Sequence, residues 1–243
     1  MVRKIPPRLY ALLASDAPVG IVFRRGPSKL VRVFLWDRER DTFKPGQLFK
    51  GKIYPDRSDL SPDGRYMIYF ALGGVGRFIS TTKGTWTAIS RAPSLTAIAL
   101  WGQGDAWGGG GMFTSNRSYW LSTDANTFLI RDTSELRRDP KPPAAGHMEH
   151  HGWINKSKPR TLVRIFEKSI RNGWILRETT RYPRPESYEI ERVEDGLKIP
   201  CPNWQWAEWD RNRLVWAEAG CLRAAKLGAE KMGTIRTLHD FNG

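Results

Sequence analysis

Three of the four histidines and one glutamate fall within seven residues, HMEHHGW, at positions 147–153. Imidazole nitrogens and carboxylate oxygens are ligands that zinc and related metal ions take from proteins. The order is not His-Glu-x-x-His, however, and adjacent side chains on a loop cannot all point at one ion. We therefore interpret His147, His150 and His151 as solvated loop histidines. Whether they bind a metal stays open at this point, and no cofactor is expected.

A glycine-rich stretch, WGQGDAWGGGG (101–111), has the composition of a loop that cradles phosphate with its backbone amides. A dinucleotide fingerprint would need a third glycine at position 107, where the chain has tryptophan, and no Gly-Lys-Ser/Thr sequence occurs. We therefore predict a flexible loop between two strands, with Trp107 exposed on it. Exposed aromatic side chains commonly contact a partner, so Trp107 and Trp153 are the candidate partner-binding aromatics.

Three tryptophans lie within six residues in PCPNWQWAEWD (200–210). Strand alternation would place Trp204 and Trp206 on one face, where core packing is the favoured interpretation. A flat platform for stacking a sugar or a base is the alternative. Catalysis has little further support, because no Gly-x-Ser-x-Gly occurs. Asp56 and Asp59 are typical of turn formers rather than of a glycosidase pair, so we expect a protein that is not an enzyme.

The chain carries a formal net charge of +14, and two segments hold most of the surplus. Residues 1–50 contain eleven Lys/Arg and four Asp/Glu, and residues 137–184 contain twelve and four. A solvated surface explains such a surplus, but its density also favours an acidic partner, with a protein preferred and nucleic acid as the alternative. The candidate partner-binding bases are Arg137, Arg138, Lys141, Lys156, Lys158, Arg160 and Arg164.

With 243 residues, 40% of them hydrophobic, the chain is long enough to bury a sizeable core. The apolar run LYALLA near the N-terminus is too short to span a membrane and poor as a signal peptide. We therefore expect a soluble, cytoplasmic protein without a membrane span. The two cysteines, Cys201 and Cys221, are too few for a metal site of their own and are interpreted as reduced thiols rather than as a disulfide.

Short segments rich in β-branched and aromatic residues, bounded by Gly, Pro, Asp or Asn, recur along the chain. They are VGIVFRR, LVRVFLW, YMIYFAL, LTAIALW, YWLS, TFLIRD, TLVRIFEKS, GWILRETT and RLVWAEAG. Helical periodicity is scarce: residues 8–15 and 133–138 have room for a turn or two, and residues 186–197 are ambiguous between strand and helix. The pattern predicts an all-β protein.

Some of these segments repeat. LVRVF at 30–34 recurs as LVRIF at 162–166, and the predicted hairpin LWDRERDTF (35–43) has a counterpart in LSTDANTF (121–128). Both offsets are close to multiples of about 44 residues, and a four-stranded propeller blade takes about 40–45 residues. The repeats therefore favour a propeller.

The most legible unit is DLSPDGRYMIYFA (59–71), in which a Ser-Pro-Asp-Gly turn precedes a strand. AEWDRNRLVWAEAG (207–220) repeats this plan with an Asp-Arg-Asn turn. The stretch 58–71 resembles the hairpins of WD40-like propellers of the TolB type, whose blades carry a Ser-Pro-Asp-Gly turn between two strands. The resemblance implies a rigid disc whose loops display contacts to partners.

We therefore expect one closed β-propeller over residues 1–243, with five blades favoured over six and with residues 137–160 as a long irregular basic loop. A pair of β-sandwiches is the less favoured fold. The expected function is a non-enzymatic binding or scaffold module for an acidic protein or peptide. A polyanion or nucleic-acid binder acting through residues 137–184 is the first alternative, and a propeller-type hydrolase or lyase acting on glycans is the second.

Overall fold

The structure is a computed structural model that describes residues 5–26, 29–73, 77–181 and 187–243. Within these residues the chain forms twenty β-strands, two short α-helices and one 3-10 turn. Each of the nine segments predicted as strands forms a strand, so the all-β prediction is confirmed. Among the described residues no helix has the length and apolar character needed to cross a membrane.

The chain divides into two compact units. The N-terminal unit is Tyr10–Ala144, and the C-terminal unit is Ala145–Gly243 together with Met1–Leu9. The division after Ala144 falls inside the segment 137–160 that the sequence predicted as irregular. Each unit has its own cluster of buried apolar side chains, as expected of parts that form separate cores.

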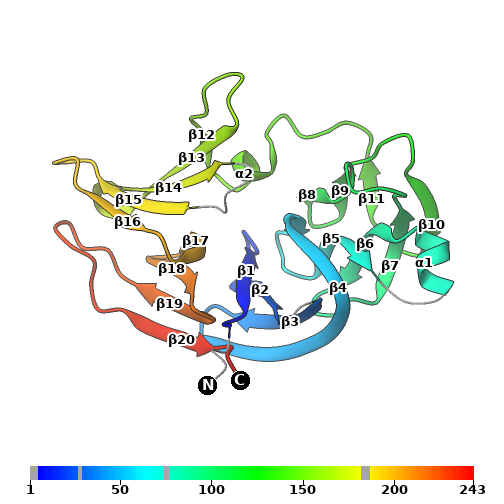
Figure 1. Cartoon of the computed structure of the whole chain (residues 1–243), viewed down its shortest axis with the longest axis horizontal. Helices are drawn as coiled ribbons and strands as arrows, with labels where there is room; N and C mark the ends of the chain where they lie inside the picture. Colours follow the sequence, from blue (N-terminus) through cyan, green and yellow to red (C-terminus); the bar gives the residue numbers. More distant parts are fainter. Residues whose placement is uncertain (1–4, 27–28, 74–76, 182–186) are drawn as a thin grey trace. The chain divides into compact units, whose positions relative to one another are not determined.

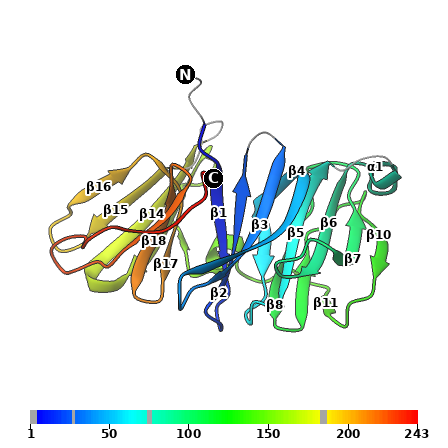
Figure 2. The ribbon, with the colours of Figure 1, turned by 90° about the horizontal axis from the view of Figure 1, so that it is seen from below.

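An eight-stranded sheet forms most of the N-terminal unit, and Figure 2 shows many of its strands side by side. Its order is β1 (Arg8–Leu13), β2 (Val19–Arg25), β3 (Leu30–Asp37), β4 (Thr42–Leu60), β5 (Tyr66–Gly73), β6 (Thr85–Arg91), β7 (Ala97–Gly102) and β10 (Phe128–Asp132). The pairs from β2 to β10 are antiparallel. The short helix α1 (Arg77–Thr82) precedes β6.

The long strand β4 joins the two halves of this sheet. It pairs with β3 through residues 42–50 and with β5 through residues 51–60. Register shifts interrupt both pairings, and such bulges bend a strand. β4 contains Pro45 and Pro55, although proline rarely occurs inside a strand.

A second sheet covers part of the first in the N-terminal unit. It has three strands, in the order β11 (Arg137–Asp139), β9 (Ser118–Leu121) and β8 (Gly111–Ser115), and β11 runs parallel to β9. Buried side chains of β5 and β6 pack against those of β8 and β9, as Ile68 and Phe113 illustrate. A separate cluster, which includes Phe23 and Trp86, fills the space along β1 to β7.

Two antiparallel sheets form the C-terminal unit. The five-stranded sheet contains β12 (Ile154–Asn155), β13 (Val163–Ile170), β14 (Trp174–Arg181), β15 (Ser187–Arg192) and β16 (Lys198–Cys201), with the 3-10 turn η1 (Arg171–Gly173) between β13 and β14. The four-stranded sheet contains β17 (Trp204–Asp210), β18 (Arg213–Glu218), β19 (Cys221–Ala225) and β20 (Arg236–Asp240). One buried cluster joins the two sheets, with Trp174 and Leu176 from the first and Trp204 and Trp216 from the second.

The prediction of a single closed β-propeller is wrong. In the described part of the chain the strands form four separate sheets, of eight, three, five and four strands, and none of them is closed into a barrel or propeller. β4 pairs with β3 at one end and with β5 at the other, so the strands before and after it belong to one sheet. The segment 121–128 is not a hairpin either, because β9 pairs with β8 and β11 whereas β10 pairs with β7.

Three local predictions also need correction. Residues 8–13, predicted as part of a helical turn, form β1, and no helix forms over 133–138. The segment 137–160 is irregular only in part, because it contains β11, the helix α2 (His147–His150) and β12. Half of the ambiguous segment 186–197 is strand, since Ser187–Arg192 form β15, while residues 193–197 lie outside any strand and Glu186 lies outside the described residues.

The turn at 61–64 has an architectural role, and the hairpins predicted at 59–71 and 207–220 both form. The amide of Tyr66 donates to the Ser61 hydroxyl (2.9 Å), and that hydroxyl donates to the Asp63 carboxylate (2.7 Å). Gly64 has a φ of +75°, which disfavours any residue with a side chain. The buried carboxylate of Asp59 accepts the amide hydrogen of Phe113 (2.7 Å) and so ties β4 to β8.

Candidate functional site

The seven predicted partner-binding bases do not belong to one unit. Three of them, Arg137, Arg138 and Lys141, lie in the N-terminal unit, where Arg137 pairs with Asp139 at 3.3 Å. The other four belong to the C-terminal unit and are Lys156, Lys158, Arg160 and Arg164. The predicted surface therefore divides into two sets of residues, and the second set is concentrated on one element.

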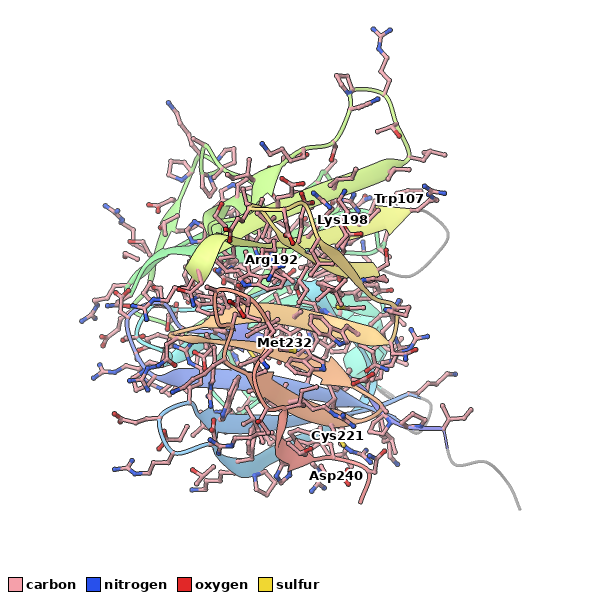
Figure 3. The ribbon with its side chains drawn as sticks, turned by 90° about the vertical axis from the view of Figure 1, so that its left-hand side faces the viewer. Trp107, Arg192, Lys198, Cys221, Met232 and Asp240 are labelled. Carbon is pink, nitrogen blue, oxygen red and sulfur yellow. The ribbon has the colours of Figure 1, made fainter. Side chains whose placement is uncertain are left out.

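That element, which we call the basic hairpin, comprises residues 154–164: β12, the following loop and the start of β13. In Figures 1 and 3 its loop extends beyond the neighbouring strands of the same sheet. Hydrogen bonds hold the loop backbone. The amide of Lys156 donates to the carbonyl oxygen of Ile165 (2.8 Å), and the amide of Ile165 donates to the Ser157 hydroxyl (2.9 Å). These bonds fix the base of the loop, at residues 156, 157 and 165.

The basic hairpin carries cationic, neutral polar and aliphatic side chains. Lys156, Lys158, Arg160 and Arg164 are all exposed, and residues 154–164 include no acid and no aromatic residue. Within the described residues none of these four bases forms an ion pair with an acidic side chain. Two apolar side chains accompany them, Leu162 with 76% of its surface exposed and Ile154 with 52%. The hairpin therefore offers unpaired positive charge next to small apolar surfaces.

On the adjoining strands β13 to β16, by contrast, charged side chains form a network of ion pairs. Arg177 on β14 donates from Nε to Glu167 on β13 (2.8 Å) and from Nη2 to Glu191 on β15 (2.8 Å), and it also pairs with Glu189. Lys198 on β16, labelled in Figure 3, lies 3.6 Å from Glu191. Strand register explains the network, because Glu167, Arg177 and Glu189 are direct cross-strand neighbours. These charges largely offset one another, in contrast to the four exposed bases of the hairpin.

We expect Arg177→Met to lower the free energy of unfolding by ~2 kcal/mol at neutral pH, because three half-buried carboxylates lose their shared cation. Hydrogen bonding from Arg177 holds the pKa of Glu191 below its ordinary value of 4.5. A carboxylate with a lowered folded-state pKa stabilises the fold above its unfolded-state pKa, and this contribution is lost as the pH falls. The difference between wild type and variant should therefore shrink below about pH 4.5. Urea unfolding across this range measures it.

The control for this variant is Lys198→Met. The Lys198 side chain is 54% exposed, so its removal should change stability by only about 0.5 kcal/mol. An Arg177→Met variant whose deficit stays constant between about pH 7 and about pH 4 would contradict the ion-pair account.

A second cluster of the C-terminal unit holds the segment 147–153 in place. The Glu208 carboxylate accepts hydrogen bonds from Lys168 Nζ (2.8 Å) and from the indole nitrogen of Trp153 (3.0 Å). It also accepts one from the backbone amide of the next residue, Trp209 (2.7 Å). Lys168 also donates to the carbonyl oxygen of His151 (2.7 Å). Only 4% of Trp153 is exposed. Its indole therefore belongs to the core and is not available to a partner, in contrast to what the sequence suggested.

Trp107, labelled in Figure 3, is the predicted loop aromatic that does lie at the surface, with 92% of it exposed. Arg57 donates to the carbonyl oxygens of Ala106 (2.8 Å) and Gly108 (3.0 Å), and the Thr87 hydroxyl accepts the amide hydrogen of Gly110 (2.8 Å). The glycine-rich loop is therefore bonded to its own unit. Because the amide of Gly110 already donates its hydrogen to Thr87, this amide cannot donate to a phosphate.

The tryptophans of 200–210 are packed rather than displayed. Trp204 stacks on Trp216 with ring centroids 4.8 Å apart, and both Trp204 and Trp206 are buried. A register shift between Trp204 and Trp206 breaks the alternation, and Ala207 packs in the same cluster as Trp204. Core packing is thus confirmed, although the two indoles do not share one face of a regular strand.

Both cysteines are free thiols in the structure. Cys201 on β16 is buried, and this burial raises the pKa of its thiol to about 12. Cys221 on β19 is half-buried, and desolvation raises its pKa as well. A thiol with a raised pKa is a weak nucleophile at neutral pH, so neither residue is prepared for nucleophilic chemistry.

The histidines that the sequence analysis treated as solvated lie on and next to α2. His147 begins the helix and His151 follows its last residue, and both are half-buried, whereas His150 is exposed. The ring centroids of His147 and His151 are 5.0 Å apart. The segment lacks His-Glu-x-x-His, but it contains a simpler signal. His147 and His151 are four positions apart, and such residues share a face when the segment is helical.

No protein-family model matches this chain, and no curated protein matches it in sequence. Its functional assignment therefore rests on the geometry of the described residues. The likeness to TolB-type hairpins stays a prediction that rests on residues 58–71.

Proposed function

We propose that the chain is a binding module for an acidic polypeptide segment and that the basic hairpin is its contact surface. One observation carries the proposal: four exposed bases without an ion pair in the described residues, on a hairpin whose base is held by hydrogen bonds. Unpaired surface cations create a positive potential that speeds encounter with acidic partners and selects them. A loop whose base is fixed in advance loses less conformational entropy on binding than one without such bonds.

The side chains of the hairpin favour a polypeptide over nucleic acid. Binding of single-stranded nucleic acid relies on aromatic side chains on which bases stack, and residues 154–164 contain none. Protein interfaces instead combine a polar rim with apolar contacts. Ile154 and Leu162 provide such apolar surface beside the bases. An acidic segment with interspersed aliphatic residues is the ligand that matches both properties.

The alternative function, a hydrolase or lyase acting on glycans, loses its main support. That alternative depended on tryptophans able to stack on a sugar ring, and Trp204 and Trp206 are buried in the C-terminal unit. A buried indole presents no face to a carbohydrate.

The test compares two variants that remove the same charge. Lys156, Lys158 and Arg160 are replaced by glutamine in one, and Arg137, Arg138 and Lys141 in the other. Each protein is titrated into a fluorescent peptide rich in Glu with interspersed Leu, and separately into single-stranded DNA of equal charge, at several salt concentrations. We expect the peptide to bind with a salt-dependent affinity. The hairpin variant should weaken this binding about tenfold or more, and the control variant less than about twofold.

Two outcomes would overturn the proposal. Equal losses in the two variants would mean that net charge, rather than the hairpin, attracts the peptide. Tighter binding to DNA than to the peptide, with a steep salt dependence, would replace the proposal with the polyanion alternative.

A further inference from the structure

We propose that His147 and His151 form a binding site for a divalent transition-metal ion, with Zn²⁺ as the reference member of the class. They are four positions apart in the sequence, which places both side chains on one face of the turn that α2 forms. Each offers a ring nitrogen, and these two nitrogens lie within 4.8 Å of one another. Imidazole is the ligand that Zn²⁺, Cu²⁺ and Ni²⁺ share. This site is independent of the basic hairpin and of any acidic partner.

The spacing of the two rings agrees with shared coordination of one ion. Zinc–nitrogen bonds of about 2.0–2.1 Å in tetrahedral geometry put the two ligating nitrogens about 3.4 Å apart and the ring centroids about 5 Å apart. The centroids of His147 and His151 are 5.0 Å apart, with an angle of 62° between the rings. The observed separation of the two rings therefore matches the one that shared coordination of a single ion requires. Zinc completes a tetrahedral set with two more donors, which water or another side chain can supply.

Three contacts fix the turn that carries the two histidines: packing of Met148, packing of Trp153 and a hydrogen bond from Lys168. Met148 and Trp153, on either side of His150 and His151, pack against the buried cluster of the C-terminal unit. The carbonyl oxygen of His151 accepts a hydrogen bond from Lys168, which is itself paired with Glu208. Ligands on a fixed backbone lose little entropy when a metal binds. The pairing with Glu208 also offsets the charge of Lys168, which would otherwise repel a bound cation.

His150 provides an internal comparison. Its ring lies 5.3 Å from that of His151, so it belongs to the same small group of imidazoles. It is exposed, and it is displaced by about 100° around the helix from His151 because the two are adjacent in sequence. We assign it no part in binding the ion.

The experiment uses the full chain, without an affinity tag, and Zn²⁺ alone as the probe in isothermal titration calorimetry. His147→Ala and His151→Ala are compared with His150→Ala and with Cys221→Ser, which removes the half-buried thiol. Loss of an outer-sphere partner alone weakens metal binding about 10–100-fold, so loss of either ligand should cost about tenfold or more. His150→Ala and Cys221→Ser should stay within about twofold of the wild type. Circular dichroism without zinc confirms that each variant is folded.

A second readout does not depend on the variants. Side-chain nitrogen NMR of the wild-type protein should show zinc-induced shifts for His147 and His151 and a much smaller shift for His150. The proposal is overturned if zinc produces no heat at millimolar concentration. It is equally overturned if the thiol or the His150 variant loses as much affinity as the two ligand variants, or if the NMR shifts fall on other residues.

Discussion

Replacement of Glu208 by alanine is expected to lower the free energy of unfolding of the C-terminal unit by ~3 kcal/mol. The Glu208 side chain is only 13% exposed and that of Lys168 20%, so little water is available to replace the lost carboxylate. The variant leaves the Lys168 ammonium and the Trp153 indole N–H without the acceptor that they share. An unpaired charge in such a place costs more than the pair contributed.

A double-mutant cycle separates this effect from loss of packing. Lys168→Met removes the cation, and the combination with Glu208→Leu replaces a charged pair with apolar groups of similar length. We expect the double variant to be more stable than Glu208→Leu alone, with a coupling of about 1–3 kcal/mol. Denaturant unfolding supplies the free energies. Hydrogen exchange then shows whether protection is lost in Ala145–Gly243, the unit that contains both residues. If the losses of the two single variants simply add in the double variant, the ion pair between Lys168 and Glu208 does not explain the destabilisation.

Replacement of Gly110 by alanine should destabilise the N-terminal unit by a similar amount, ~3 kcal/mol. Gly110 has a φ of +86°, a left-handed conformation that penalises any side chain. A Cβ atom there would also lie 2.2 Å from the carbonyl oxygen of Arg57, a backbone atom that cannot rotate away. Moving the backbone would disturb β4 and the hydrogen bond from Gly110 to Thr87.

Gly104 is the matched control, because it lies in the same loop with a φ of +78° but has its nearest neighbour, the flexible Lys83 side chain, 3.5 Å from the position of a Cβ atom. Gly104→Ala should therefore cost only the conformational part, ~1 kcal/mol. The two variants are compared by urea unfolding. Hydrogen exchange should assign the loss in Gly110→Ala to Tyr10–Ala144. Equal destabilisation of both would mean that the close approach to Arg57 has no energetic weight.

Close packing thus accounts for Gly109 and Gly110 but not for Gly104. Gly109 also has a left-handed φ, and a Cβ atom on it would lie 2.4 Å from the ring of Phe70. Such approaches to other segments decide which of the glycines can be replaced, and composition alone does not reveal them. The same loop presents Trp107 at the surface, which the sequence did predict.

Local chemistry in the sequence determined the all-β class and the two turn-containing hairpins. The segment Val19–Arg25 is a strand at the bounds predicted for it, and the turn at 61–64 forms with the left-handed Gly64 that its Ser-Pro-Asp-Gly sequence implies. Strand propensity and turn conformation depend on residues a few positions apart, so they can be read along the chain.

Only the tertiary structure decided which segments pair and which side chains meet. β10 pairs with β7 rather than with the nearer β9, and β4 continues through two prolines, so the repeat that favoured a closed propeller has no counterpart in the sheets. Trp153 reaches Glu208 across 55 residues. These outcomes depend on burial and hydrogen bonding between segments that are distant in sequence, where many pairings satisfy the same alternation of apolar residues. Likewise, the helical turn at α2 and the contacts that fix it bring the rings of His147 and His151 to the separation on which the proposed metal site rests.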